Sequence, residues 1–390
     1  MKYNFDESID RTNSHSVKLE RLKPVFGSDN LIPLWVADMD FKSPPAIIEA
    51  LRRRVEHGVF GYTVTPEAYT NSIIRWLDRR HHWQAKKEQI SFVPGVVKGL
   101  AFAIDLFTGK GDKIIIQPPV YHPFRLVPQS LGREVVNNPL LLEEGQYRMD
   151  FAGLREIIAQ NDCKMLILCN PHNPGGRAWS AEELKELAAI CYDNSILVVS
   201  DEIHSDMALP GYRHTPFATV SEKAQANSLT FMAPSKTFNI AGIVSSFAVI
   251  PNKELRDQFL AYLEPRELSQ GTIFAYTATT AAYDECEDWL DEMVEYVQGN
   301  VNFVNNYLKE YIPQIKAMLP EASFLVWLDC RDLHLTQPDL VRLFVDKAGL
   351  ALNDGSIFGP GGEGFMRLNV GTTRKVLEQA LNNLKKALFG

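Results

Sequence analysis

Two ionisable side chains directly follow apolar runs in the middle of the sequence. The run 196–200 (ILVVS) ends at Asp201, and the run 228–232 (SLTFM) is followed by Ala-Pro-Ser-Lys-Thr, which contains Lys236. A lysine among small hydroxyl-bearing residues can form a Schiff base, because desolvation lowers its pKa. A carboxylate at the end of a buried strand is costly unless it meets a cation. Taken singly, Lys236 could be a surface lysine and Asp201 a helix cap.

A possible phosphate site follows the run 90–94 (ISFVP). Gly95 comes next and opens the segment GVVKGLAFAIDLF, which has the pattern of a helix. The first amides of a helix have no partner within the helix and lie at the positive end of its dipole. The amides of Val96 and Val97 could therefore bind a phosphate, although a plain strand-to-helix turn would have the same pattern.

Two further apolar runs lead to residues that could contact a ligand. The run 164–169 (KMLILC) precedes NPHNPGG, in which Asn173 lies among two prolines and two glycines. This composition predicts a rigid turn in which a cis X-Pro bond can occur. The run 113–117 (KIIIQ) is followed by PPVY, and Tyr121 could either pack in the core or stack on an aromatic ligand.

Together these groups meet the needs of one cofactor, pyridoxal 5′-phosphate (PLP). Lys236 supplies the Schiff base, and Asp201 keeps the ring nitrogen protonated so that the ring can withdraw electrons. The helix that starts at Gly95 holds the phosphate, and Tyr121 covers a face of the ring. Each feature has a structural explanation of its own, but one cofactor accounts for all of them.

The apolar runs predict the sheet that must position these residues. Unbroken apolarity is typical of parallel strands that are buried on both faces, and helix-length amphipathic segments alternate with them. In such α/β folds, ligands bind beyond the carboxyl ends of the strands. The predicted strands are 90–94, 113–117, 164–169, 196–200, 228–232 and 245–250.

The C-terminal part of the sequence has a different pattern. Long helical patterns extend from Glu254 to Tyr311, and then come ASFLVWL, a helix from about Pro338, FMRLNV and a final helix. This order predicts a smaller α+β unit beside the α/β domain. We expect an N-terminal segment at 1–45 that packs on the small domain, a large domain at 46–285 and a small domain at 286–390.

Composition and charge exclude several classes of protein. The net charge of −8 comes without a run of Lys or Arg, which argues against nucleic-acid binding and favours small-molecule partners. The N-terminus has no apolar signal region, and the longest apolar stretch, 241–251, is far shorter than a membrane span. The sequence therefore predicts a cytoplasmic protein.

The cysteines do not suggest a disulfide framework or a metal site. Their number is odd, their spacing is wide and no CxxC occurs. This pattern predicts reduced, buried thiols and no bound metal. The five cysteines are Cys163, Cys169, Cys191, Cys286 and Cys330.

The sequence resembles fold-type-I PLP enzymes of the class I/II aminotransferase family and, within it, the MalY/PatB-type cystathionine β-lyases. The resemblance spans nearly the whole chain and implies the aspartate aminotransferase fold, with the roles given above for Lys236 and Asp201. The segments that carry it are LWVADMDF (34–41), FGYT (60–63), PGVVKGL (94–100), PPVYHPF (118–124), NPHNPGGRAW (170–179), SDEIHSDM (200–207) and SKTFNIAG (235–242).

The resemblance also implies roles around the cofactor ring and the substrate. Asn173 and His204 lie near the cofactor's O3′, Ile203 covers one ring face and Tyr121 stacks on the other. Arg367 binds the α-carboxylate of an amino-acid substrate, with Asn173 beside it. Many aminotransferases have tyrosine at the position of His204, and histidine suits the lyase subgroup. A satisfied core histidine and a structural ion pair of Arg367 are the alternatives.

At the phosphate, the resemblance implies contacts from two subunits. The amides of Val96 and Val97 and the hydroxyl of Ser235 come from one chain, and Tyr62 comes from the other subunit of a homodimer. Tyr62 could also be an ordinary packing residue. Many aminotransferases have a cationic residue where this chain has Val244, so the group that balances the phosphate charge is not identified.

The resemblance favours a carbon–sulfur β-lyase over two other functions. In that reaction Lys236 removes the Cα proton of a cysteine thioether, a thiolate leaves Cβ, and pyruvate and ammonia are released. An aminotransferase for hydrophobic, aromatic or sulfur amino acids would use the same carbanion. A regulatory PLP-fold binding protein is the third hypothesis. His81 and His82 are interpreted as a solvated helix end without a role.

Overall fold

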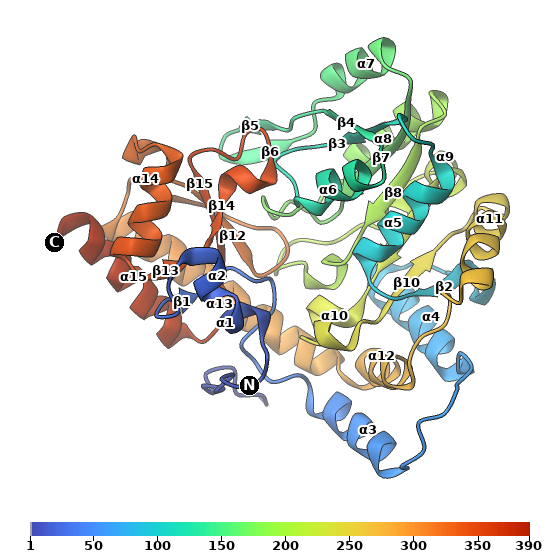
Figure 1. The fold of residues 1–390 in the computed structure, drawn as a ribbon, viewed down its shortest axis with the longest axis horizontal. Coiled ribbons are helices and arrows are strands. Elements are labelled where there is room, and N and C mark those ends of the chain that lie inside the picture. The colour runs from blue at the N-terminus through green and yellow to red at the C-terminus, as the bar shows by residue number, and fades with distance from the viewer. Residues whose placement is uncertain (1) are drawn as a thin grey trace.

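A seven-stranded sheet is the largest element of the computed structural model, which describes residues 2–390 (Figure 1). The strand order is β2-β10-β9-β8-β7-β3-β4. All six predicted strands of this sheet are present, and the short edge strand β4 was not predicted. The strands are β2 (Ile90–Val93), β3 (Lys113–Ile116), β4 (Glu134–Asn137), β7 (Cys163–Cys169), β8 (Leu197–Asp201), β9 (Ser228–Met232) and β10 (Ser246–Val249).

The sheet is mainly parallel, with one exception. β4, β3, β7, β8 and β9 pair in parallel, whereas β10 is antiparallel to both β9 and β2. The prediction of a parallel strand at 245–250 is therefore wrong. The connection 233–245 holds only the short helix α10 (Pro234–Thr237) and a single 3₁₀ turn, so the chain returns from the same edge of the sheet without a long crossover helix.

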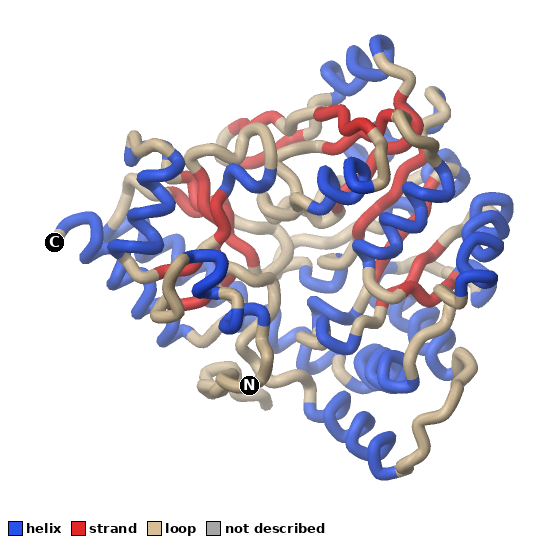
Figure 2. The backbone as a smooth tube through the Cα atoms, viewed as in Figure 1, coloured by secondary structure: helices blue, strands red, loops and turns tan. Residues whose placement is uncertain are grey.

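Helices cover both faces of this sheet, which explains the unbroken apolar runs (Figure 2). Within β7, Leu166 packs in one core and its neighbour Ile167 packs in the other. The core of Ile167 includes α5 (Val96–Phe107), α6 (Pro123–Ser130) and α11 (Lys253–Leu263). The core of Leu166 includes α7 (Phe151–Gln160), α8 (Ala181–Asp193) and α9 (Glu222–Ala226).

A third core joins the remaining helices to a smaller antiparallel sheet. That sheet has the order β11-β12-β15-β14, and its strands β12 and β15 correspond to the predicted runs 322–328 and 365–370. Its strands are β11 (Lys316–Met318), β12 (Leu325–Asp329), β14 (Asn353–Asp354) and β15 (Phe365–Asn369). The helices are α3 (Pro45–Glu56), α4 (Glu67–His81), α12 (Ile273–Glu285), α13 (Glu287–Tyr311), α14 (Gln337–Arg342) and α15 (Arg374–Phe389).

The N-terminal segment contacts the C-terminal part of the chain. Strand β1 (Ile32–Pro33) pairs in parallel with β13 (Leu350–Ala351), and the amide of Asn369 donates to the carbonyl of Leu34. The domain boundaries at residues 45 and 285 stay a prediction. The other short elements are α1 (Val17–Glu20), α2 (Leu22–Phe26) and the hairpin β5 (Leu141–Glu143) with β6 (Gln146–Arg148).

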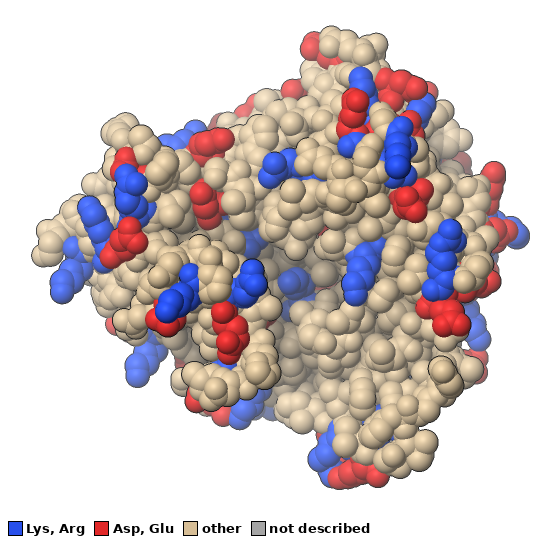
Figure 3. Space-filling model, in the orientation of Figure 1, with Lys and Arg blue, Asp and Glu red and all other residues tan. Residues whose placement is uncertain are grey.

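The distribution of surface charge and the state of the cysteines match what the sequence predicts. Acidic and basic side chains are interspersed on the face in Figure 3, around a central hollow in which basic atoms are visible. All five cysteines are buried and unpaired, as predicted. Within residues 2–390, no helix is both long and apolar enough to cross a membrane.

Helix α5 lies unusually close to the sheet at Gly99. A Cβ at Gly99 would lie 2.6 Å from Cε1 of Phe231 on β9, so this glycine allows the contact. We expect Gly99→Ala to lower the free energy of unfolding by about 1–3 kcal/mol, despite the higher helix propensity of alanine. Urea denaturation measures this change. Gly242→Ala is the control, because nothing lies within 4 Å of its Cβ position; equal stability of the two variants would contradict the packing.

Candidate active site

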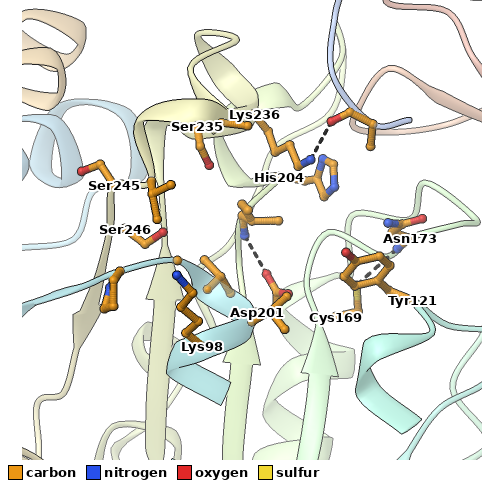
Figure 4. Close-up of a pocket in the computed structure, with 18 residues that line it drawn as sticks. Lys98, Tyr121, Cys169, Asn173, Asp201, His204, Ser235, Lys236, Ser245 and Ser246 are labelled. Carbon is orange, nitrogen blue, oxygen red and sulfur yellow. Dashed lines mark hydrogen bonds between the residues drawn. The ribbon is translucent and has the colours of Figure 1, made fainter. Parts of the chain in front are cut away.

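A cavity of about 350 Å³ lies at the carboxyl ends of the central strands (Figure 4). It brings together nearly all of the residues that the sequence singled out, from five separate strand ends. Arg367 and Tyr62 are not among its lining residues. The predicted site residues that line it are Val96, Val97, Tyr121, Asn173, Asp201, Ile203, His204, Ser235 and Lys236.

One end of the cavity is formed by the start of α5. Gly95 precedes the helix with φ of 112°, a conformation that favours glycine, and no side chain caps the first turn. The amides of Val96 and Val97 therefore have no partner within the helix. The buried side chain of Ser235 lines the same cavity. These donors make an anion site at a helix N-terminus.

Lys236 lies in α10, directly after β9. Its Nζ donates a hydrogen bond of 2.6 Å to the carbonyl oxygen of Ala37. Burial, together with the positive charge of Arg367, lowers the pKa of Lys236 to about 8. A substantial fraction of this amine is therefore neutral near physiological pH and can act as a nucleophile or base.

Asp201 ends β8, the neighbour of β9. Its carboxylate accepts a hydrogen bond of 3.1 Å from the amide of Ile203, and this is the dashed line beside Asp201 in Figure 4. Burial raises the pKa of Asp201 to about 7. Within residues 2–390, no Lys, Arg or His lies within ion-pair distance of this carboxylate. The ionised form therefore needs a cationic partner in the cavity.

Tyr121 and Asn173 come from the turns after β3 and β7. The Tyr121 amide donates to the Asn173 carbonyl over 3.0 Å, and the ring of Tyr121 faces the cavity beside Cys169 (Figure 4). Cys169 accepts a hydrogen bond from the amide of Asn173 and was not predicted as a lining residue. The predicted turn has cis peptide bonds at Asn170–Pro171 and Asn173–Pro174.

Arg367 is a buried cation on β15. Its Nη1 donates to Oδ1 of Asn173 over 3.0 Å, and its Nη2 donates to Oδ1 of Asn353 and to the carbonyl of Trp35. Within residues 2–390 no carboxylate forms an ion pair with it, so the structural ion-pair alternative is wrong. Burial lowers the pKa of Arg367 to about 10, which leaves it charged at neutral pH. A buried cation without an anion is suited to bind an anionic ligand group.

His204 is neutral at physiological pH. Burial lowers its pKa to about 3, and the positive charges of Lys236 and Arg367 act in the same direction. Its Nδ1 lies 3.1 Å from the hydroxyl oxygen of Ser323. His204 therefore contributes a hydrogen-bonding group to the cavity rather than a positive charge.

The segment that contains Ala37 is held in place by charged groups. Arg11 contacts Asp38 and Asp40, each over 2.7 Å, and the buried Lys18 contacts the same two carboxylates. The sequence indicated this segment only as part of LWVADMDF. The two acids, spaced by one residue, were the available signal, but their partners are distant in the sequence.

Two asparagines bind residues 36–39, one from the small sheet and one from the loop after Lys236. Asn369 on β15 donates to the carbonyls of Val36 and Asp38 over 2.6 and 2.7 Å. Asn239, three residues after Lys236, accepts from the amide of Met39 and donates to the same residue's carbonyl. The wall formed by residues 36–39 is therefore fixed on one side to the small sheet and on the other to the lysine loop.

The prediction that His81 belongs to a solvated helix end is wrong. His81 is buried, and its Nε2 lies 2.8 Å from Oδ1 of Asp206. Trp76 and Thr237, the residue after Lys236, also donate to Asp206. Burial alone would raise the pKa of Asp206, but the hydrogen bonds, led by that of His81, hold it below its ordinary value. The sequence could not indicate a partner so far along the chain. His82 is exposed, as predicted.

Tyr62 lies outside the cavity of its own chain. It is fully exposed in the segment between α3 and α4, which runs along the outer edge of the molecule (Figure 1). Its neighbours Val59, Phe60 and Val64 are also exposed. A set of exposed apolar side chains is typical of a surface that contacts another protein.

A model of the aminotransferase class I and II family matches residues 29–384. The chain belongs to this family. It is 43% identical to cystathionine β-lyase PatB of Bacillus subtilis, over 99% of this chain and 100% of PatB. This similarity confirms the predicted subgroup.

Solved structures confirm the predicted fold class. A PLP-bound putative aminotransferase from Clostridium difficile 630 is 41% identical, with a TM-score of 0.97 over 99% of this chain and 100% of that one. A PLP-bound C-S lyase from Staphylococcus hominis is 32% identical, with a TM-score of 0.92 over 100% and 98%. The whole chain therefore has the architecture of these enzymes.

The raised pKa of Asp201 predicts how stability depends on pH without ligand. Between pH 4 and 7 the folded protein keeps a proton that the unfolded chain releases, so the free energy of unfolding falls as pH rises. Above pH 7 Asp201 is ionised in both states, so the loss in free energy of unfolding no longer grows with pH. Asp201→Asn should therefore be more stable than the wild type at pH 8, by roughly 4 kcal/mol, and lose this advantage near pH 4. Denaturation at both pH values measures this difference in stability, and Asp346→Asn, which changes an exposed aspartate, is the control. A stability difference that does not depend on pH would contradict the prediction.

Proposed function

We propose that this chain is a PLP-dependent carbon–sulfur β-lyase, which eliminates a thiol from a cysteine thioether and yields pyruvate and ammonia. The observation that carries the proposal is the full-length similarity to the cystathionine β-lyase PatB. The similarity to a PLP-bound C-S lyase supports the same reaction. The geometry of the cavity supports the cofactor and the class of substrate.

The cavity residues fit PLP. The unpaired amides at the start of α5 suit its phosphate, and the buried carboxylate of Asp201 needs the cation that a protonated ring nitrogen provides. When bound, PLP supplies an electron sink for negative charge at the substrate Cα. The residues that would hold it are Lys236 through a covalent bond, Asp201 at the ring nitrogen, Asn173 and His204 at O3′, Ile203 and Tyr121 at the ring faces, and Val96, Val97 and Ser235 at the phosphate.

Arg367 binds the substrate carboxylate in this proposal. Its guanidinium is buried, charged and without an acidic partner in the described chain, and Asn173 and Asn353 fix its orientation. A planar guanidinium can bind a carboxylate through two parallel hydrogen bonds. This contact selects substrates that have a carboxylate and orients the Cα proton relative to the lysine.

Lys236 moves the proton in this proposal. Its lowered pKa of about 8 allows it to accept the proton from the substrate Cα near neutral pH and to remain protonated for part of the cycle. Asp201 holds negative charge beside the protonated ring nitrogen, while the neutral His204 adds no charge. The bond from Cβ to sulfur then breaks, and the sulfur leaves with the electron pair as a thiolate.

Transamination is the second candidate function, favoured by the similarity to a putative aminotransferase at 41% identity. Both reactions begin when Lys236 removes the same Cα proton. They diverge in whether sulfur leaves Cβ or a proton returns to another carbon. His204 suits the lyase subgroup by resemblance, but the chemistry of the residues described above does not select one outcome. The assay must therefore compare the two products directly.

We further propose a cytoplasmic homodimer in which Tyr62 contacts the phosphate in the partner's site. The full exposure of Tyr62 and the partial exposure of the apolar residues around it support a contact with a second chain. The buried, unpaired cysteines are typical of a reducing compartment.

L-Cystathionine should give pyruvate, ammonia and homocysteine without an added keto acid. Lys236→Ala should lose this activity by about 10³-fold, because the covalent bond and the proton transfer are both removed. Pyruvate release and amino transfer to 2-oxoglutarate are measured side by side on cystathionine, cysteine and aromatic amino acids. If transfer exceeds elimination by about tenfold on all of them, the chain is an aminotransferase.

Borohydride reduction and peptide mapping should find the cofactor on Lys236 and on no other lysine.

Subunit mixing tests the role of Tyr62. Tyr62→Ala and Lys236→Ala should each be impaired, but a hybrid dimer has one site with both residues intact. Random exchange of subunits should restore about a quarter of the wild-type activity. Tyr212→Ala, which changes another exposed tyrosine, is the control and should keep full activity. A fully active monomer in sedimentation would contradict the proposal.

A further inference from the structure

We infer that Lys98 balances the phosphate charge of the cofactor, a role that rests on the proposed function. A phosphate monoester carries a charge of about −1.5 to −2 at neutral pH. The other groups expected around it are neutral donors, namely backbone amides and the hydroxyls of Ser235 and Tyr62. The dipole of α5 adds only about half a positive charge. A full cation is therefore needed near the start of α5.

The position at which many family members carry this cation is apolar here. Val244 lines the cavity, and the residue is 41% exposed. Its φ of 58° lies in the left-handed region, which is unfavourable for a β-branched residue. Val244 therefore cannot neutralise the phosphate charge.

Lys98 is in the right place to supply the charge. It is the third residue of α5, directly after the two valines whose amides line the cavity, and its own side chain lines the cavity too. Figure 4 shows the side chain of Lys98 leaving α5 with its ammonium group directed toward the side of the cavity where Ser246 lies. Ser235, Ser245 and Ser246 line the same cavity.

Lys98 is also available. Within residues 2–390 its ammonium group forms no ion pair and no hydrogen bond. The other basic groups near the cavity are already committed: Lys236 donates to Ala37, Arg367 to two asparagines and a carbonyl, and Lys18 and Arg11 to acidic side chains. A flexible point charge on a long stem suits a phosphate, because it needs no fixed two-point geometry.

The test compares two ligands that differ only in the phosphate. Full-length wild type, Lys98→Gln and Lys98→Arg are freed of cofactor and titrated with PLP and with pyridoxal, and absorbance gives each dissociation constant. Lys110→Gln is the matched control, because Lys110 is an exposed lysine beyond the other end of the same helix. Titrations at low and high salt report how much of the binding is electrostatic.

Lys98→Gln should weaken PLP binding by about tenfold, leave pyridoxal binding unchanged and reduce the salt dependence of PLP binding. Lys98→Arg should keep most of the affinity. Two results would overturn the inference. PLP binding equal to that of Lys110→Gln would mean that another group, such as one from a partner subunit, balances the charge. Equal losses for PLP and pyridoxal would mean that Lys98 only shapes the cavity. A wild type without a reducible adduct on Lys236 would instead contradict the proposed function.

Discussion

The burial of two ionisable groups at one edge of the central sheet is the constraint on which the site depends. Lys236 and Asp201 follow neighbouring strands, β9 and β8, and Asp201 is paired in register with Phe231. Burial moves their pKa values toward each other, to about 8 and about 7. Each group is thus close to the point at which it gains or loses a proton near neutral pH, which acid–base chemistry requires. The surrounding cores must supply the stability that this burial removes.

Much of the site follows from local sequence, because the important residues come directly after short apolar strands. The strand ends at Asp201, Lys236 and Asn173 could be predicted since burial on both faces produces an unbroken apolar run, and parallel strands bring their carboxyl ends to one edge. Family resemblance added Arg367, which the small sheet positions from far along the chain. The reversed direction of β10 was missed because an apolar run carries no information about strand direction.

The features that the sequence did not reveal all depend on contacts between distant segments. His81 meets Asp206 only after α4 packs beneath the lysine loop. The carbonyl of Ala37 reaches Lys236 only because the N-terminal segment crosses over the cavity. The sequence analysis assigned no role to Lys98, because its position on the cavity depends on where α5 begins relative to β10. No local pattern encodes such pairings.

The wall at residues 36–39 has a mechanical consequence. Asn369 binds it to the small sheet, Asn239 binds it to the loop after Lys236, and Ala37 itself accepts the hydrogen bond from Lys236. Any rotation of the small sheet relative to the large one must therefore pull on the lysine or break one of these bonds. The wall is therefore a short hydrogen-bonded link between the small sheet and the amine of Lys236.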